Sequence, residues 1–451
     1  MPTHSDPAES TVATATPVDD ILQGGIDGSS GAVAPALESA PLAAVIELVR
    51  SGRATTRPQL VTVSGLGRRI VSQRVEQALE LGLLQEGELA RSEGGRQARS
   101  LKFNSQAGHV YAALVGASEM TVAVADLDGR LTDSIHEDWS VESGPAATME
   151  RLREHFTTLA RRTGVHRPWG IGIGVPGPVD FASGRLAAPP IMPGWDGFSV
   201  RAWLRDHYDA PVWVDNDVNL MALGEWTQGQ NNDRRDMLFI KVGTGVGAGL
   251  IVHGRLVRGE RGGAGDIGHT HVTDDPTKAC RCGKTGCLEA VAGGSSLLME
   301  ATDRSNESPA LQKAIDSKGR LTLGDIGNAA RNGDPLALQL IDQRARAIAE
   351  VAANLVNFCN PKWLVIGGGV LRTGTRFLEV LEAKVLERCT DLVADSLEIR
   401  PASLDHLEGV IGAALLGAES LLHPATLTRW VEDGSPLGHA AALQRHAAAF
   451  N

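Results

Sequence analysis

The 451-residue sequence predicts a mixed α/β protein, with a small helical module near its N-terminal end and two α/β lobes after it. Two observations predict this class. Apolar residues recur at helical spacing over about residues 41–81, and strand-like and helix-like patterns alternate from residue 109 onward. Each later half begins with two apolar strands around a turn, which indicates two lobes with a cleft where a ligand can bind.

Composition narrows the class of protein. The hydrophobic share is 42% and the charged share is 22%, as in average globular domains. No run of about 18 apolar residues occurs, and the first residues lack the pattern of a secretion signal, so we expect a cytoplasmic protein without a membrane segment. Because thiols stay reduced in the cytoplasm, clustered cysteines there favour metal binding over disulfides.

Charge is distributed unevenly along the chain. The formal net charge is -11, yet residues 41–105 contain ten basic and six acidic residues. Residues 1–40 contain six acidic residues and neither Lys nor Arg. A small basic module therefore precedes an acidic body. Residues 1–36 have few large side chains and are expected to be a disordered leader.

Three helices are predicted in the module, which spans residues 37–105. The first ends at Gly52, and the second opens at Thr56-Arg57-Pro58. A tight turn at Ser64-Gly65-Leu66 leads into the third helix, residues 68–81. Five apolar side chains of the third helix are expected to point inward: Ile70, Val71, Val75, Ala78 and Leu79.

Residues 89–101 follow as two short strands around a Gly-Gly tip. Three helices and a basic hairpin form a winged helix-turn-helix, whose third helix enters the major groove of DNA. A helical bundle with a solvated charged face is the alternative, but it explains neither the hairpin nor the local positive charge. Candidate contacts with bases or phosphates are Arg57, Gln59, Arg68, Arg69, Ser72, Gln73, Arg74 and Arg96.

The two lobes are expected within residues 107–422, at roughly 107–235 and 236–422. Each opens with a strand pair: residues 110–115 with 121–126, and residues 238–242 with 250–252. Residues 423–451 are rich in Ala and His, and they carry no functional prediction beyond a helix and a mobile end.

The segment Asp215-Asn-Asp-Val-Asn219 lies where a strand meets a helix. Phosphoryl transfer to a hydroxyl needs a carboxylate that accepts the alcohol proton, and Asp217, next to an Asn that can orient a diol, suits that role. Asp217 and Asn219 are also residue types that commonly cap helices. The two roles can coexist.

The loop 243–249 reads Gly-Thr-Gly-Val-Gly-Ala-Gly. Glycine permits backbone conformations that bring N–H groups close to a phosphate. A glycine-rich hairpin turn needs no ligand, however, so the loop by itself is a weak indication. The candidate phosphate-binding residues are Gly243, Thr244, Gly245 and Gly247.

Cysteine spacing predicts a metal site. Cys280, Cys282 and Cys287 fall within eight residues, and His269 and His271 lie a short loop upstream. A C-x-C-x4-C knuckle closed by one of these histidines would give zinc a saturated Cys3His shell, which makes the ion structural. The alternative is a loop with three reduced cysteines.

Together these motifs resemble the ROK family of repressors, open reading frames and sugar kinases. The His followed by C-x-C-G-x-x-G-C-x-E is the most specific of them, and Gly94-Gly95-Arg96 resembles the module of the family's repressors. The resemblance covers roughly residues 107–422. The matching segments are residues 170–179, 193–197, 215–219, 243–249, 265–269, 280–289 and 366–369.

The resemblance implies an actin-like, two-lobed fold of the sugar kinase and hexokinase type, in which structural zinc shapes a sugar pocket. In kinase members Asp217 would be the base. The implied zinc ligands are His269, Cys280, Cys282 and Cys287. The implied sugar-binding residues are Asn216, Asp217, Asp266, His269 and Glu289.

Two positions depart from the family's pattern. Asp266 stands where the family usually has Glu, which leaves the identity of the sugar open. Leu114 stands where kinase members carry the Asp of a D-x-G-G-T phosphate loop. Leucine cannot supply the charge that a magnesium-nucleotide site needs, so ATP with Mg²⁺ is not expected as a cofactor.

The sequence therefore predicts a sugar-responsive transcriptional regulator, most simply a repressor of carbohydrate uptake or metabolism genes. Its expected partners are operator DNA, a sugar or sugar phosphate, and a second copy of the chain in a homodimer or a dimer of dimers. An active ATP-dependent sugar kinase is the alternative. A repressor with a periplasmic-binding-type sensor is a third hypothesis, which has no use for the cysteines.

Overall fold

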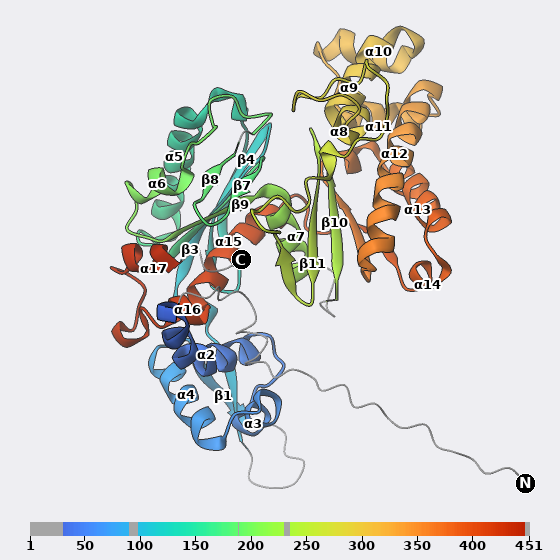
Figure 1. Ribbon diagram of the computed structural model, residues 1–451. Coiled ribbons are helices and arrows are strands. Elements are labelled where there is room, and N and C mark those ends of the chain that lie inside the picture. The colour runs from blue at the N-terminus through green and yellow to red at the C-terminus, as the bar shows by residue number, and fades with distance from the viewer. Residues whose placement is uncertain (1–29, 90–97, 188, 230–234, 447–451) are drawn as a thin grey trace, which may run out of the picture. The chain divides into compact units, whose positions relative to one another are not determined.

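The structure is a computed structural model, and it describes residues 30–89, 98–187, 189–229 and 235–446. The chain forms two compact units (Figure 1). The terminal unit comprises Met1–Ala107 and Leu421–Phe450, and the central unit comprises Gly108–Ser420. None of the described helices is long and apolar enough to cross a lipid bilayer.

The terminal unit contains three helices and a hairpin, as predicted. Thr56 caps the second helix by accepting a hydrogen bond from the Gln59 N–H, and Gly65 ends it with a φ of 69°. The hairpin strands pair Leu84 with Phe103 in antiparallel register. The elements are α2 (Ser30–Arg50), α3 (Arg57–Ser64), α4 (Arg68–Glu80), β1 (Leu84–Leu89) and β2 (Arg99–Phe103).

Two details of the terminal unit differ from the predictions. Helix α2 begins at Ser30, inside the expected leader of residues 1–36. Ile70 is 42% exposed rather than inward, although Val71, Val75 and Ala78 of the same helix are buried. The buried face of α4, which packs on α2, α3 and β1, is therefore narrower than the apolar pattern suggested. The wing tip and its Arg96 lie outside the described residues.

The C-terminal segment completes the core of the terminal unit. Helix α16 (Pro424–Leu427) packs against α2, and α17 (Ala440–His446) follows it. Trp430 is fully buried, and its Nε1 donates a hydrogen bond to the Leu421 carbonyl at 3.1 Å. Thr428 donates to the Ser39 hydroxyl at 2.6 Å. Residues 421–446 therefore have a structural role that the sequence did not predict.

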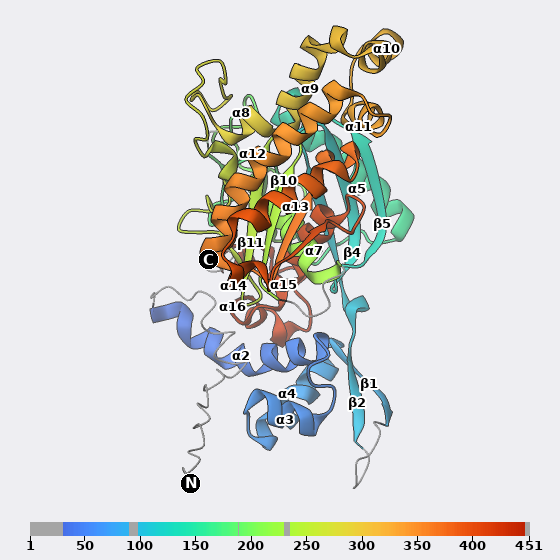
Figure 2. The ribbon, with the colours of Figure 1, turned by 90° about the vertical axis from the view of Figure 1, so that its right-hand side faces the viewer.

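The central unit is built from two five-stranded sheets of the same topology (Figures 1 and 2). In each sheet three antiparallel strands are followed by two parallel ones, so the predicted pair of related lobes is present. The first sheet contains β3 (His109–Val115), β4 (Glu119–Asp126), β5 (Leu131–Asp138), β6 (Gly170–Val175) and β9 (Val212–Asn216). The second contains β10 (Met237–Val242), β11 (Val246–Val252), β12 (Arg255–Val257), β13 (Trp363–Gly367) and β14 (Glu398–Pro401).

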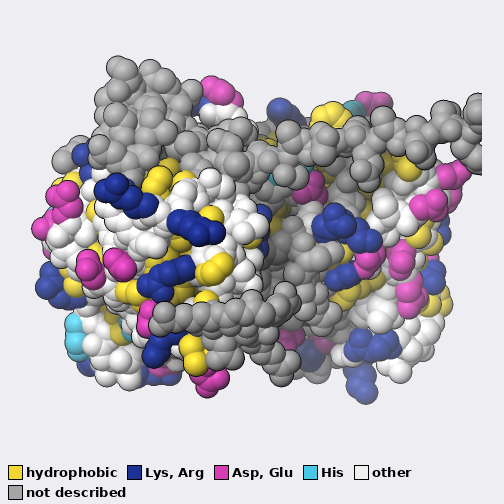
Figure 3. All heavy atoms as spheres, turned by 90° about the horizontal axis from the view of Figure 1, so that it is seen from below, with side chains coloured by type: hydrophobic (Ala, Val, Ile, Leu, Met, Phe, Trp, Pro, Cys, Tyr) yellow, Lys and Arg dark blue, Asp and Glu magenta, His cyan; other side chains and the backbone are white. Residues whose placement is uncertain are grey.

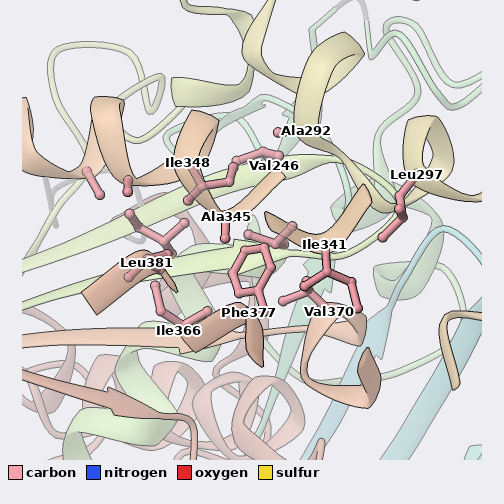
Figure 4. Close-up of a cluster of buried hydrophobic side chains, with 14 of the residues drawn as sticks. Val246, Ala292, Leu297, Ile341, Ala345, Ile348, Ile366, Val370, Phe377 and Leu381 are labelled. Carbon is pink, nitrogen blue, oxygen red and sulfur yellow. The ribbon is translucent and has the colours of Figure 1, made fainter. Parts of the chain in front are cut away.

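Each lobe has its own apolar core. In the first, α5 (Pro145–Thr163) packs on β4 and β5. In the second, Ile341 and Ile348 of α12 (Pro335–Cys359) meet Phe377 of α13 (Arg376–Arg388) over the sheet (Figure 4). Shorter helices complete the lobes: α6 (Val200–Arg205), α7 (Asp217–Gln228), α8 (Leu288–Ala292), α9 (Gly294–Asp303), α10 (Pro309–Lys318), α11 (Leu323–Arg331) and α14 (Asp391–Ala394).

Helix α15 (Glu408–Leu422) packs on the first lobe, although residues up to 422 were assigned to the second. A Cβ at Gly412 would lie 1.8 Å from the Leu220 carbonyl oxygen of α7. A Cβ at Gly172 of β6 would lie 1.8 Å from the Ala413 carbonyl oxygen. Only glycine permits these close approaches, so the last helix of the central unit is fixed against the start of that unit.

Truncation of Trp430 tests the role of the C-terminal segment. Trp430→Ala should destabilise the terminal unit by about 3–5 kcal/mol, because it leaves a large cavity and removes the hydrogen bond to Leu421. Amide hydrogen exchange in α2 reports this unit separately and should become faster. Met299→Ala, at a side chain that is 64% exposed, is the control and should change exchange little. Unchanged exchange in α2 would contradict the packing.

Candidate functional site

The start of α7 fixes the side chains of the Asp215–Asn219 motif. Asn216 caps the helix, since its Oδ1 accepts from the Val218 N–H at 2.9 Å and its Nδ2 donates to the Gly177 carbonyl at 3.0 Å. Asp217 also accepts from the Val218 N–H, at 2.9 Å. The helix cap is therefore Asn216, and not Asp217 or Asn219 as the alternative had it. The cap fixes Asn216 without using all of its hydrogen-bonding capacity.

Asp217 forms an ion pair with Lys241 at the end of β10. The Nζ–Oδ2 distance is 2.5 Å, and the side chains are 22% and 4% exposed for Lys241 and Asp217 respectively. Burial lowers the pKa of Lys241, but the charge and the hydrogen bond of Asp217 outweigh it and leave that pKa raised. The Lys241 ammonium is therefore charged at neutral pH. The sequence analysis missed Lys241, although it is the one charged residue in the apolar strand β10.

A second ion pair anchors Asp215. Its Oδ2 accepts from Arg258 Nε at 2.7 Å, and its Oδ1 accepts from Asn219 Nδ2 at 2.9 Å. The Arg258 guanidinium also lies over the Phe181 ring, 4.1 Å from the ring centroid. Arg258 follows β12 of the second lobe, so this pair and the Lys241 pair both join the second lobe to the first. Arg258 was not singled out from the sequence.

The glycine loop meets Glu289 of α8. Glu289 Oε2 accepts from the Val246 N–H at 3.3 Å, and a Cβ at Gly245 would lie 2.0 Å from the same oxygen. Glu289 Oε1 also pairs with Arg281 at 3.4 Å. A side chain at position 245 would therefore displace the end of the Glu289 side chain, whatever else the loop binds. The loop connects β10 and β11 and continues the strand that carries Lys241.

Four predicted metal ligands converge. The ligand atoms of His269, Cys280, Cys282 and Cys287 all lie within 4.8 Å of one another. His269 Nδ1 is 3.5 Å from Cys280 Sγ, and Cys282 Sγ is 3.7 Å from Cys287 Sγ. A tetrahedral site with metal–sulfur bonds of about 2.3 Å has edges of about 3.8 Å. The donor set and its spacing therefore fit a four-coordinate metal.

The fold decides between the two histidines. His271 lies outside the group of four, and its side chain is 60% exposed and pairs with Asp274 at 3.6 Å. Asp266, a predicted sugar-binding residue, is 52% exposed and lies 3.9 Å from His269 Nε2. The turn from residue 265 to residue 269 thus places one metal ligand and one exposed carboxylate side by side.

Leu114 is packed as a core residue. It is 8% exposed, and a Cβ at Gly409 would lie 2.3 Å from its Cδ2. Glu408, the first residue of α15, is 2% exposed, and within the described chain its Oε2 has no hydrogen-bond partner. Burial raises the pKa of the Glu408 carboxyl to about 7.

In the terminal unit, the predicted DNA-contacting residues fall into two groups. Arg68, Arg69, Ser72 and Gln73 are exposed on one side of α4, and Gln59 is exposed on α3. The other described residues have protein partners. Arg57 pairs with Glu86 at 3.3 Å, and Arg74 donates to Gln77 at 2.8 Å. Lys and Arg side chains appear on the side of the molecule drawn in Figure 3.

Comparison with known proteins identifies the family. Residues 110–420 match the sequence model of the ROK family. The chain belongs to the ROK family. The resemblance seen in the motifs is thereby confirmed, and so is the fold class.

Relatives named as kinases and relatives named as repressors are both similar to this chain. A glucokinase of Halalkalibacterium halodurans is 34% identical, over 67% of this chain and 92% of the relative. A xylose repressor of Caldicellulosiruptor bescii is 26% identical, over 84% of this chain and 95% of the relative. The repressor alignment therefore extends over more of this chain than the kinase alignment does.

A solved structure covers both units. The crystal structure of a ROK family transcriptional regulator, a homologue of the E. coli MLC protein, has a TM-score of 0.73 and 24% identity, and it covers 87% of this chain and 98% of its own. Identity at this level shows the shared fold, including the terminal unit.

Loss of one thiolate tests the metal group. Cys282→Ser should weaken metal binding by more than the roughly 10- to 100-fold that loss of an outer-shell contact costs, since it removes a ligand. Elemental analysis of the purified chain measures the metal, and thermal denaturation measures the lost stability. Cys389→Ser, at a free thiol outside the group, is the matched control. A full equivalent of metal in Cys282→Ser would contradict the site.

Proposed function

We propose that this chain is a sugar-responsive DNA-binding transcriptional regulator that represses genes of carbohydrate uptake or metabolism. One observation carries the proposal: a winged helix-turn-helix unit is fused to a ROK unit in a single chain. The extent of the similarity to the xylose repressor supports it, because that similarity reaches beyond the part shared with the glucokinase. As expected from the sequence, we assign it to the cytoplasm.

DNA would be bound by the terminal unit. Helix α4 would enter the major groove, with its exposed side chains Arg68, Arg69, Ser72 and Gln73 facing bases and phosphates. Gln59 is exposed and its Oε1 accepts from the Thr55 N–H, and Arg57 and Arg74 likewise have protein partners that they would have to leave to reach DNA. Arg96 stays a candidate from the sequence. Recognition of two half-sites would require a homodimer or a dimer of dimers.

The sugar would bind in the central unit at the start of α7. Asn216 and Asp217 would accept or donate hydrogen bonds to hydroxyl groups, with contributions from Asp266, His269 and Glu289. Zinc would be held by His269 and the three cysteines, and its chemistry when bound is structural, since the protein fills all four positions. The ion would fix the segment that presents His269 and Glu289 to the sugar.

Binding of DNA and its response to sugars provide the test. The full chain should shift a fragment from its own upstream region, and one sugar in a panel should change the affinity of that complex. Arg69→Ala should weaken the complex by about 1–3 kcal/mol, because it removes a charged contact. Arg161→Ala on α5 is the control in the central unit. The proposal would be contradicted if the chain formed no specific complex with DNA, or if no sugar or sugar phosphate changed the affinity of that complex.

The second candidate function is an ATP-dependent sugar kinase. Two observations favour it: Asp217 is present, and the glucokinase is the relative with the higher identity. Leu114 argues against it, since a buried leucine stands where a carboxylate would help hold the metal and nucleotide. We therefore do not assign roles in catalysis to Gly243, Thr244, Gly245 and Gly247, which stay candidate phosphate contacts.

A coupled assay with ATP and a panel of sugars separates the two functions. The wild-type chain should show no turnover above that of Asp217→Ala, because the nucleotide side of the site lacks the carboxylate. Turnover that depends on Asp217 would make the chain a kinase, with DNA binding as an additional property. Asp128→Ala, in the turn after β4, is the matched carboxylate control.

A further inference from the structure

Lys241 lies beside the glycine loop on which a phosphate was predicted to bind. A Cβ at Gly243 would lie 3.3 Å from Lys241 Cε, and a Cβ at Gly368 would lie 3.1 Å from Lys241 Cγ. The side chain therefore runs between the glycine loop after β10 and the glycines after β13. Its ammonium ends 2.5 Å from Asp217. The lysine thus occupies space beside the carboxylate that a transferred phosphoryl group would need.

The surroundings of this ammonium are acidic. Asp217 contacts it directly, and Glu119 and Glu408 also interact with it electrostatically. The nearby cations are already matched, because Arg258 pairs with Asp215 and Arg281 pairs with Glu289. One ammonium therefore interacts with several carboxyl groups, and the three cations named here, Lys241, Arg258 and Arg281, each already pair with a carboxylate.

Asp217 can nevertheless accept a hydroxyl. One of its oxygens accepts from Lys241 and the other from the Val218 N–H. Each carboxylate oxygen has a second lone pair, so a neutral sugar hydroxyl can still donate to Asp217. The contact with Lys241 fixes the orientation of the Asp217 carboxylate toward such a hydroxyl.

We propose that Lys241 is a specificity-determining residue through which this site selects an unphosphorylated sugar over the same sugar with a phosphate ester on the hydroxyl beside Asp217. The inference rests on the proposed function and names the chemical class of its effector. A phosphate ester carries about -1.5 to -2 charges at neutral pH. It would have to displace the ammonium from Asp217 and then face the carboxylates that Lys241 now balances.

The opposite outcome is a lysine that binds the phosphate. Lysine is a common phosphate ligand, and glycine N–H groups lie next to it. That arrangement needs an ammonium with spare charge, whereas this one is within direct hydrogen-bonding distance of a carboxylate that is 4% exposed. The geometry therefore favours the neutral sugar.

Calorimetric titration of the full-length protein tests the inference. The probes are free hexoses, pentoses and N-acetylhexosamines, each paired with its 6-phosphate, or its 5-phosphate for a pentose. In the wild-type chain the free sugar that binds should have a Kd at least about tenfold lower than its phosphate ester, since like charges brought together oppose binding. The same compounds are then tested on the complex with DNA.

Two variants and a control isolate the lysine. Lys241→Gln removes the charge and should weaken binding of the free sugar by about tenfold or more, because Asp217 is left without its cation. Lys241→Arg keeps the charge and should keep the preference for the free sugar. Lys384→Gln removes a lysine that pairs with Glu387 at 2.7 Å on α13, and it should bind like the wild type. If Lys241→Gln fails to fold, the wild type and Lys241→Arg still decide the question.

The outcomes separate this inference from the proposed function. Tighter binding of a free sugar supports both. A phosphate ester that binds more tightly than its sugar, loses that advantage in Lys241→Gln and still alters DNA binding would overturn the inference and leave the proposed function standing. If no compound in the panel binds, both are overturned.

Discussion

Two buried carboxylates at the junction of β9 and α7 constrain the central unit, because each needs a cation that only the second lobe supplies. Asp215 meets Arg258 and Asp217 meets Lys241, and both carboxylate side chains are only 4% exposed. Removing one member of such a buried pair costs about 3–5 kcal/mol, because the remaining charge has no partner. The start of α7 is therefore held by contacts from the second lobe, and the positions of Asp215 and Asp217 depend on how the two lobes pack.

The fold was largely predictable because its signals are local. Strand pairs around glycine turns predicted both lobes, and the spacing of the cysteines predicted a metal group. The ion pairs were not predictable. Lys241 meets Asp217 only because β10 pairs in parallel with β13 and packs under α7, which are long-range relationships. Spacing also permitted either His269 or His271 as a ligand, and only the folded chain shows that His269 lies with the three cysteines.

ROK proteins named as kinases and as repressors share the central architecture, so the difference between them has to lie in a few side chains and in what else the chain carries. Here Leu114 makes an apolar contact with the start of α15. Lys241 forms an ion pair with Asp217, the candidate base. Neither Leu114 in β3 nor Lys241 in β10 interrupts the strand to which it belongs. The same scaffold can thus accommodate different side chains at these two positions.

The terminal unit is made from both ends of the chain, with Trp430 buried beside elements that begin four hundred residues earlier in the sequence. During synthesis, α3 and α4 leave the ribosome long before the segment that completes their core. The unit can reach its final packing only after the whole central unit has been translated. A prematurely terminated chain would carry α3 and α4 without this support, so a complete terminal unit is found only in molecules that also contain a complete central unit.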